Sequence, residues 1–268
     1  MIPARAIALT IALWVSGIDA FAQQQPVMPP ATHRRPRQAQ PARTTEGPRV
    51  HLEIDGLYHA ATQTLSDTVS PVLYAETSSL TAGYDVPAGP GFSGGASFRL
   101  WKFLGFGATA SSYSTSFPAR LAGSIPNPFV FNRARQFEGS VADLTRKELA
   151  LGAHLRVLLQ VSPKFTVSVF AGPTRLSVTQ DVVTAIQYSE SYPYDTATFR
   201  AAALATDSVN KWGIGAGADL AFYFTRNIGV GAGLKYSGGK ADLVSLSGRT
   251  LTTRLGGAEF GGGLRVRF

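Results

Sequence analysis

The feature that most constrains this chain is a two-residue period of apolar side chains. In residues 212–224 every even position is apolar, from Trp212 to Phe224, whereas the odd positions hold Gly, Ala, Asp or Tyr. Successive side chains of a β-strand point to opposite faces, so this segment is predicted to be a strand with one apolar face. Residues 225–227 form a short turn and the alternation resumes over 228–236, which predicts a β-hairpin.

The same alternation recurs along the chain from residue 50. It predicts further strands at 50–61, 92–101, 104–117, 147–160, 165–178 and 252–268, which makes about eight antiparallel strands in all. An even number of this size closes a small all-β barrel. Short turns near Lys102, Pro163 and Arg226 alternate with longer connections at 62–89, 118–146, 179–210 and 241–251. A transmembrane up-and-down β-barrel alternates in this way, with short periplasmic turns and long outer loops.

The composition agrees with a protein whose surface does not all face water. Charged residues make up 16% of the chain, against about 25% in ordinary soluble domains. At a rise of ~3.3 Å per residue and a tilt of ~40°, residues 212–224 reach roughly 30 Å, enough to cross an apolar band of ~25 Å. Aromatic residues at the strand ends are predicted to form two interface girdles, unless they fill the core of a soluble sandwich. They are Trp101, Phe103, Phe165, Phe222, Phe224 and Phe268 at the short-turn end, and Tyr58, Tyr113, Phe117, Trp212 and Tyr236 at the other.

Residues 1–22 are predicted to be a cleaved secretory signal peptide. Arg5 precedes an apolar run at 6–15, and Ala20 and Ala22 occupy the small positions before a cleavage site. Residues 23–49 are rich in Pro, Gln and Arg, which predicts a disordered periplasmic linker. This linker holds five Arg and one Glu, so that it contributes +4 of the +8 formal charge, and we expect no nucleic-acid partner. Residues 50–268 then form the barrel.

The last predicted strand carries an apolar pattern on one face, made of Phe260, Leu264, Val266 and the terminal Phe268. This pattern resembles the C-terminal signature that bacterial outer-membrane barrels present to their assembly machinery. With the signal peptide and the predicted hairpins, residues 50–268 resemble the small OmpA-like or OmpX-like outer-membrane β-barrel family. The resemblance implies a location in the outer membrane of a Gram-negative-type bacterium, insertion by the barrel assembly machinery and contact with outer-membrane lipid. It implies no single activity, and we expect a monomer.

The polar face of the predicted strands is expected to line the barrel interior. It carries ionisable residues of both signs: Glu53, Asp55, His59, Arg99, Glu148, His154, Arg156, Asp219, Lys235, Glu259 and Arg265. Side chains fill the interior of a barrel of about eight strands, so these groups are predicted to form a paired charge network. The alternative is a narrow, porin-like solute path, for which inward glycines between 213 and 263 would leave room. Those glycines could instead relieve crowding where strands bend or large neighbours pack.

No catalytic or metal site emerges from the sequence, and we expect no cofactor. The chain has no Cys, which excludes a thiol nucleophile, a thiolate metal site and a disulfide. None of the His residues stands in the His-x-Ser arrangement of outer-membrane lipid deacylases; His154 is followed by Leu155 and Arg156. A glycine-rich motif at 213–218 lies within a predicted strand, which argues against a nucleotide site.

The predicted loops carry the most specific chemistry. Residues 119–135 combine Phe and Pro with Arg, and residues 188–194 add a Tyr- and Pro-rich tip. Exposed aromatic and Arg side chains are typical anchors of interfaces, so these loops are predicted to bind an extracellular ligand. We therefore expect a non-enzymatic structural or surface-interaction protein. The alternatives are the solute path, a lipid-modifying enzyme, or a soluble lipocalin-like barrel with its apolar face turned inward.

Overall fold

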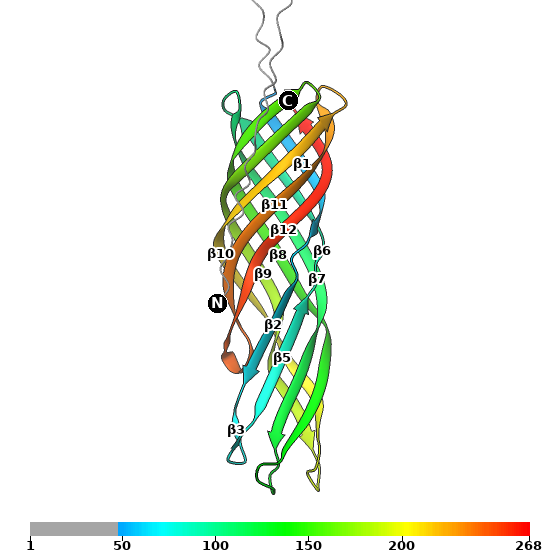
Figure 1. Cartoon of the computed structure of the whole chain (residues 1–268), viewed down its shortest axis with the longest axis vertical. Helices are drawn as coiled ribbons and strands as arrows, with labels where there is room; N and C mark the ends of the chain where they lie inside the picture. Colours follow the sequence, from blue (N-terminus) through cyan, green and yellow to red (C-terminus); the bar gives the residue numbers. More distant parts are fainter. Residues whose placement is uncertain (1–47) are drawn as a thin grey trace, which may run out of the picture. The chain divides into compact units, whose positions relative to one another are not determined.

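Eight antiparallel strands form a closed hydrogen-bonded ring in the computed structural model, which describes residues 48–268 (Figure 1). The predicted signal peptide and all but the last two residues of the predicted linker lie outside the described residues. The ring strands are β1 (Val50–His59), β6 (Gly89–Arg99), β7 (Leu104–Pro126), β8 (Ala134–Ser162), β9 (Phe165–Glu190), β10 (Ala197–Tyr223), β11 (Ile228–Val244) and β12 (Thr250–Arg267). Each pairs with its neighbour in the chain, and β12 pairs with β1. The predicted up-and-down barrel is confirmed.

The prediction of long outer loops is wrong. Most of residues 118–146, 179–210 and 241–251 belong to strands, because β7 to β12 run on past their predicted ends. The connection at 62–89 likewise contains β2 (Gln63–Val69) and β5 (Ser79–Val86), joined through the small hairpin of β3 (Val72–Leu73) and β4 (Glu76–Thr77). A single 3₁₀ turn, η1 (Leu246–Gly248), joins β11 to β12. The short turns between β6 and β7, β8 and β9, and β10 and β11 lie where they were predicted.

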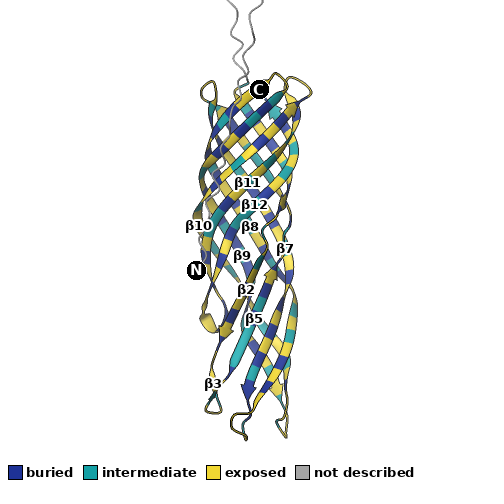
Figure 2. Ribbon diagram, in the orientation of Figure 1, coloured by how far each residue is buried: buried dark blue, intermediate teal, exposed yellow. Residues whose placement is uncertain are grey.

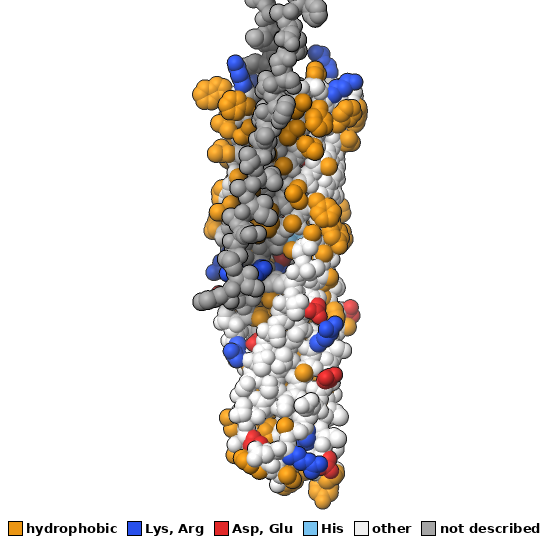
Figure 3. All heavy atoms as spheres, in the orientation of Figure 1, with side chains coloured by type: hydrophobic (Ala, Val, Ile, Leu, Met, Phe, Trp, Pro, Cys, Tyr) orange, Lys and Arg blue, Asp and Glu red, His pale blue; other side chains and the backbone are white. Residues whose placement is uncertain are grey.

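The barrel therefore has two parts. We call residues 50–59, 89–113, 147–178, 212–236 and 258–268 the ring half, and the remaining described residues between 60 and 257 the extension. In the ring half the apolar face of every strand points outward, where Ile54, Phe92 and Ile214 are 68, 77 and 72% exposed. Figure 3 shows one side of the outer surface: hydrophobic side chains crowd it over the ring half, whereas it is largely polar over the extension. A closed barrel with an outward apolar belt is a transmembrane β-barrel, since closure leaves no strand edge unpaired in lipid.

The extension has the opposite arrangement. Its apolar side chains point inward and pack into a core that includes Tyr84, Leu121, Ile125, Val183 and Leu251. A second cluster, with Val182, Leu243 and Leu255, lies next to it. Buried and exposed residues alternate along the strands of both parts, as Figure 2 shows. The extension is thus built like a water-soluble β-structure that continues the same strands.

A bulge in β8 helps to exchange the faces. Phe117 of β7 is opposite Leu144 and Ala119 is opposite Val141, so β8 contains one extra residue there. Asp143, within the bulge, has a φ of 63°. An extra residue shifts the two-residue period by one, so odd positions of β8 point inward in the extension, as Phe137 does, whereas even positions do so in the ring half.

The outer aromatic girdle is smaller than predicted. Tyr58, Trp212 and Tyr236 are 43, 72 and 62% exposed at the border between the two parts. Tyr113 and Phe117 are each only 3% exposed and point into the barrel, so their assignment to the girdle was wrong. Tyr113 and Phe117 are odd positions of β7, like the inward Ser111, so all three side chains point to the same face. The sequence interpretation placed the two aromatic residues near the strand end without assigning them to that face.

Candidate functional site

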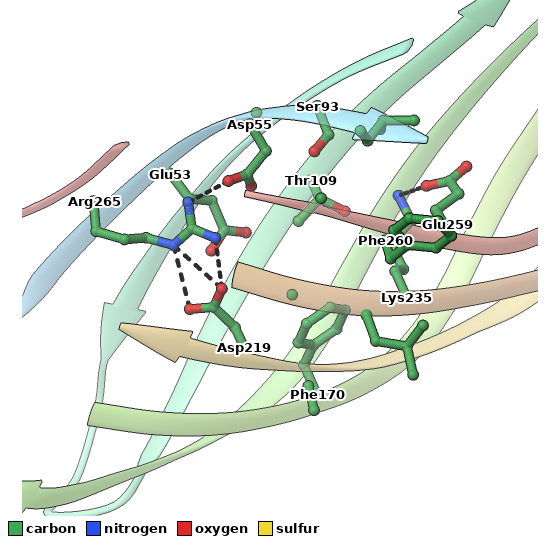
Figure 4. A pocket seen from close by; sticks show the side chains of 16 residues that line it. Glu53, Asp55, Ser93, Thr109, Phe170, Asp219, Lys235, Glu259, Phe260 and Arg265 are labelled. Atoms are coloured by element: carbon green, nitrogen blue, oxygen red, sulfur yellow. Dashed lines mark hydrogen bonds and ion pairs between the residues drawn. The ribbon is translucent and has the colours of Figure 1, made fainter. Parts of the chain in front are cut away.

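Charged side chains from several strands meet inside the ring half. Figure 4 shows Arg265 of β12 between two carboxylates: its Nη1 donates to Asp55 of β1 and its Nη2 to Asp219 of β10, each at 2.5 Å. The Arg265 side chain is 4% exposed and the two carboxylate side chains are 12 and 10% exposed. A buried guanidinium is stable only where carboxylates and hydrogen bonds compensate it, and this arrangement supplies both.

A second pair crosses the lumen. Arg156 of β8 donates from Nη2 to Glu53 Oε1 at 2.8 Å and from Nη1 to Glu53 Oε2 at 2.9 Å. The two-point contact uses both carboxylate oxygens, which fixes the relative position of β8 and β1. The guanidinium also lies 4.9 Å from the centre of the Phe170 ring.

The third group lies nearer the extension. Lys235 Nζ is 3.1 Å from Glu259 Oε2 and donates to Ser111 Oγ at 2.8 Å. His59 Nδ1 lies 3.6 Å from Glu259 Oε1, and the His59 ring stacks on Tyr113 with centroids 4.4 Å apart. This group joins β1, β7, β11 and β12 across the interior.

The remaining predicted lumen residues lie apart from these three groups. Glu148 pairs with Arg146 at 2.6 Å, on the border with the extension. His154 packs against the Phe170 ring at 4.9 Å, and neither of its ring nitrogens has a hydrogen-bond partner among the described residues. Arg99 lies at the end of β6 by the short turns, where Tyr223 and Arg267 are its neighbours.

Two arginines that the sequence interpretation missed lie at the two ends of the ring half's lumen. Arg146, 2% exposed, bonds Glu148, Gln180, Thr253 and the carbonyl of Arg254. At the short-turn end Arg267 donates to the carbonyls of Arg226 and Pro163, and its guanidinium lies 3.7 Å from the Tyr223 ring centre. Both positions continue the inward parity of Glu148 and Arg265, so extending the polar face by one step in each direction would have found them.

The inward glycines provide space that side chains occupy. A Cβ at Gly231 would lie 2.7 Å from Arg265 Nε, one at Gly95 would lie 2.5 Å from Glu53 Oε1, and one at Gly217 would lie 2.6 Å from the Phe170 ring. The cavity between these groups measures about 50 Å³. The glycines therefore relieve crowding around Arg265, Glu53 and Phe170, and the ring half holds no wide passage at this level.

The far end of the extension carries exposed aromatic side chains. Phe129, Phe131 and Tyr192 are 73, 69 and 84% exposed. We call residues 127–133 and 191–195 the tip. The Asn127 Oδ1 atom accepts from the backbone of Phe129 at 2.9 Å, and its Nδ2 donates to the carbonyl of Tyr194 at 2.9 Å. These bonds tie the β7–β8 connection to the β9–β10 connection.

Charged groups lie next to the tip, at the ends of the strands that lead into it. Arg135 forms an ion pair with Glu190 and donates to the carbonyl of Pro126. Tyr74 OH donates to the second oxygen of Glu190 at 2.9 Å, and this hydrogen bond, with a small contribution from burial, raises the pKa of Tyr74. Further from the tip, in β9, burial of Asp181 opposes its ionisation. Hydrogen bonds from Thr206 and Thr145 outweigh this effect and hold the pKa of this carboxyl below its usual value.

The predicted assembly-signature residues lie along one strand face. Phe260, Leu264 and Phe268 are 50, 44 and 63% exposed on the outside of β12, and Val266 shares their parity. Their side chains form part of the apolar belt. Recognition by the assembly machinery stays a prediction.

Comparison with known proteins finds structural likeness alone. No protein-family model matches the chain, and no curated protein matches its sequence. The chain is similar in structure to the outer membrane protein OprG from Pseudomonas aeruginosa, with 8% identity, a TM-score of 0.47, and coverage of 83% of this chain and 97% of OprG. It is also similar to Neisserial surface protein A, at 12% identity, a TM-score of 0.41 and coverage of 82 and 97%. The outer membrane protease OmpT from Escherichia coli matches at 10% identity, a TM-score of 0.44 and the same coverage.

Proposed function

We propose that this chain is an integral outer-membrane β-barrel protein with a non-enzymatic surface-interaction role. The observation that carries the proposal is the contrast between the two parts of the barrel. The ring half is apolar outside and holds compensated charges inside, whereas the extension is polar outside and ends in exposed aromatic rings. Such a molecule is anchored in lipid by one part and presents the other to the aqueous surroundings.

The outer membrane of a Gram-negative-type bacterium is the location that fits this contrast. The predicted signal peptide would direct the chain out of the cytoplasm, and the barrel assembly machinery would insert it as a monomer in contact with outer-membrane lipid. The short turns then lie on the periplasmic side and the extension lies outside the cell.

The tip has the properties of a binding surface. Large aromatic side chains contribute most of the energy of many interfaces, and they do so best where they are held in place before binding. Here Phe129 packs edge to face against Tyr194 with ring centroids 5.3 Å apart, and Asn132 N donates to Glu76 of the β3–β4 hairpin at 3.1 Å. Three connections are therefore linked at the tip, which reduces the entropy that a partner would have to remove.

Cysteine labelling on whole cells tests the orientation, because the chain contains no Cys of its own. A membrane-impermeant maleimide is expected to label a Phe131→Cys variant, whose position is in the tip, and to spare a Lys102→Cys variant in a short turn. Labelling of the short-turn variant alone would reverse the proposed orientation. Labelling of both on intact cells would contradict the membrane anchor.

Adherence measurements test the role of the tip. Cells that display a variant with Phe129, Phe131 and Tyr192 changed to Ser are expected to lose most of their adherence to one another or to immobilised matrix. The matched control carries Ser66→Ala, Glu138→Gln and Arg200→Gln, three exposed positions on the wall of the extension. Equal adherence of the tip variant and the control, with both barrels folded, would contradict the proposal.

A further inference from the structure

One stretch of the barrel wall has no backbone ladder. The pairing of β12 with β1 ends with a bond from Ala60 N to Ala258 O at 2.9 Å. Directly beyond it, Gly256 and Gly257 have φ values of 71 and 153°, which favour Gly because they place a Cβ in conflict with the backbone. Within residues 48–268, β2 pairs with β5 alone, so no backbone ladder joins β2 to β12 beyond this point.

We call the stretch between β2 and β12 that lacks a backbone ladder the seam. Side chains bridge it instead. In the orientation that satisfies both of its amide atoms, Gln63 donates to Thr253 Oγ1 at 3.1 Å and accepts from Arg254 N at 2.8 Å. Further from the ring half, Leu246 N donates to Asp67 Oδ2 at 3.0 Å. Beside these contacts the seam contains an open cavity of about 570 Å³, which we call the recess. Its volume is within the ~300–1,000 Å³ range of ligand pockets.

The recess passes from the outer surface towards the barrel interior. Its floor is formed by His59, Tyr113, Arg146 and Glu148, and its walls include small residues at 60–62 and 256–258. The charges of the floor are already compensated, because Glu148 accepts from Arg146 Nε at 2.7 Å and from Gly256 N at 2.9 Å. The floor therefore offers hydrogen-bonding groups without a net charge.

The mouth of the recess carries an uncompensated pair of cations. Lys240 of β11 and Arg254 of β12 are directly opposite each other, and both are exposed on the outer face. Neither forms an ion pair with a carboxylate among the described residues; Asp242, two positions along, accepts instead from Thr252 Oγ1 at 2.7 Å. Like charges directly opposite on paired strands destabilise a sheet. An anion between them would relieve this repulsion.

Polar groups lie behind the cations. Ser237 lines the recess, but its side chain is 1% exposed and points into the barrel, on the opposite face of β11 from Tyr236. Gln63 and Glu148 add amide and carboxylate atoms, and Tyr236 presents a ring that is 62% exposed at the mouth. Amide and carboxylate groups beside an aromatic ring match the hydroxyls and the apolar face of a sugar.

We propose that the recess binds a phosphorylated sugar headgroup, with the phosphate between Lys240 and Arg254 and the sugar against Tyr236 and Gln63. The mouth lies at the border of the apolar belt, beside the girdle residues Tyr58 and Tyr236. A glycolipid of the neighbouring leaflet is therefore in the right place to supply the headgroup. A soluble sugar phosphate shares the chemistry and is the other source.

Binding of lipid A by the purified full chain in detergent micelles tests the proposal. The double variant Lys240→Gln/Arg254→Gln is expected to bind lipid A at least about tenfold more weakly, because two charge-assisted contacts with the phosphate are lost. An Ala60→Trp variant, which fills the recess and keeps both cations, is expected to lose about as much. Heat-modifiable gel migration verifies that each variant retains a folded barrel.

The control removes the same charge elsewhere. Lys147→Gln/Arg175→Gln changes exposed residues of β8 and β9 and is expected to leave the affinity within about twofold. Equal losses in the two double variants would show diffuse surface electrostatics, and no loss in either would show that these charges do not contribute to binding; each result would overturn the site. Two further results would overturn the site as well: undiminished binding of lipid A by Ala60→Trp, or undiminished binding of dephosphorylated lipid A by the wild type.

A competition experiment separates the two sources. Glucosamine 1-phosphate in excess is expected to displace lipid A from the wild type, and failure to do so would overturn headgroup recognition. Displacement at concentrations similar to those of lipid A would support the site and identify a soluble sugar phosphate as the ligand. Displacement only at much higher concentrations would support it with the glycolipid as the ligand.

Discussion

Removal of one partner from the Arg156–Glu53 pair tests whether the lumen is dry and closed. In an Arg156→Met variant the Glu53 carboxylate would lose both of its bonds to the guanidinium, at 2.8 and 2.9 Å. The two side chains are only 4 and 10% exposed, so little water is available to replace the bonds. Breaking a buried pair in this way costs about 3–5 kcal/mol, because a charge is left without compensation.

Replacing both partners should have a much smaller effect. Glu53→Leu/Arg156→Met removes the desolvation penalty together with the attraction, so the free energy of unfolding is expected to stay within about 1 kcal/mol of the wild type. The single variant should therefore be less stable than the double variant. This order is the opposite of the one expected if each side chain contributed independently.

Urea unfolding of the barrel in lipid vesicles, followed by tryptophan fluorescence, measures these differences. Trp101 and Trp212 are 74 and 72% exposed on the outside of the ring half, so their emission should report its transfer between lipid and water. A loss below about 1 kcal/mol in the single variant would refute the reasoning, since it would mean that water screens the pair. It would also restore the solute path as a candidate function.

Three further outcomes are expected. Purified wild-type protein in planar bilayers should show no steady single-channel conductance, because Arg265, Arg156 and Arg146 and their partners occupy the lumen; a reproducible open level would contradict this. Gly231→Ala should reduce the folded fraction seen as heat-modifiable migration, since its Cβ would lie 2.7 Å from Arg265 Nε, whereas Gly56→Ala, with nothing within 4 Å, should not. The pKa of Asp181 is lowered in the folded chain, so its contribution to stability is complete above the ordinary pKa near 3.8 and is lost as the pH falls through the folded value. Hydrogen exchange of the β9–β10 amides should thus accelerate in acid more strongly in the wild type than in Asp181→Asn, and identical pH profiles would count against this role.

The sequence located the ring half well because a single rule governs it. Between Trp212 and Tyr236 one face meets apolar surroundings along the whole hairpin, so the two-residue period is unbroken and residues such as Asp219 and Lys235 must point inward. The inward parity also identified both partners of the Arg156–Glu53 pair and all three members of the Arg265 group. It could not say which acid pairs with which base, because strands distant in the sequence, such as β1 and β8, bring those partners together.

The extension escaped the sequence interpretation for a physical reason. Its apolar side chains face the interior, so a rule that assigns every apolar face to lipid does not apply to it. The extra residue at Asp143 also reverses which positions of β8 point inward. The recess is invisible in the sequence for another reason. Its mouth joins Lys240 to Arg254 across a hairpin, and its floor adds His59 and Glu148 from other strands.

The sequence by itself determined the barrel, its short turns and the charged inner face, since these follow from local alternation and from the need to keep charge away from lipid. Only the tertiary structure decided which charged side chains pair in the lumen, that the strands continue into an extension with inverted faces, and that a seam between β2 and β12 contains a cavity. Those properties depend on strand register and on contacts between residues as far apart as Glu53 and Arg156. A local pattern fixes which way a side chain points but not what it meets there.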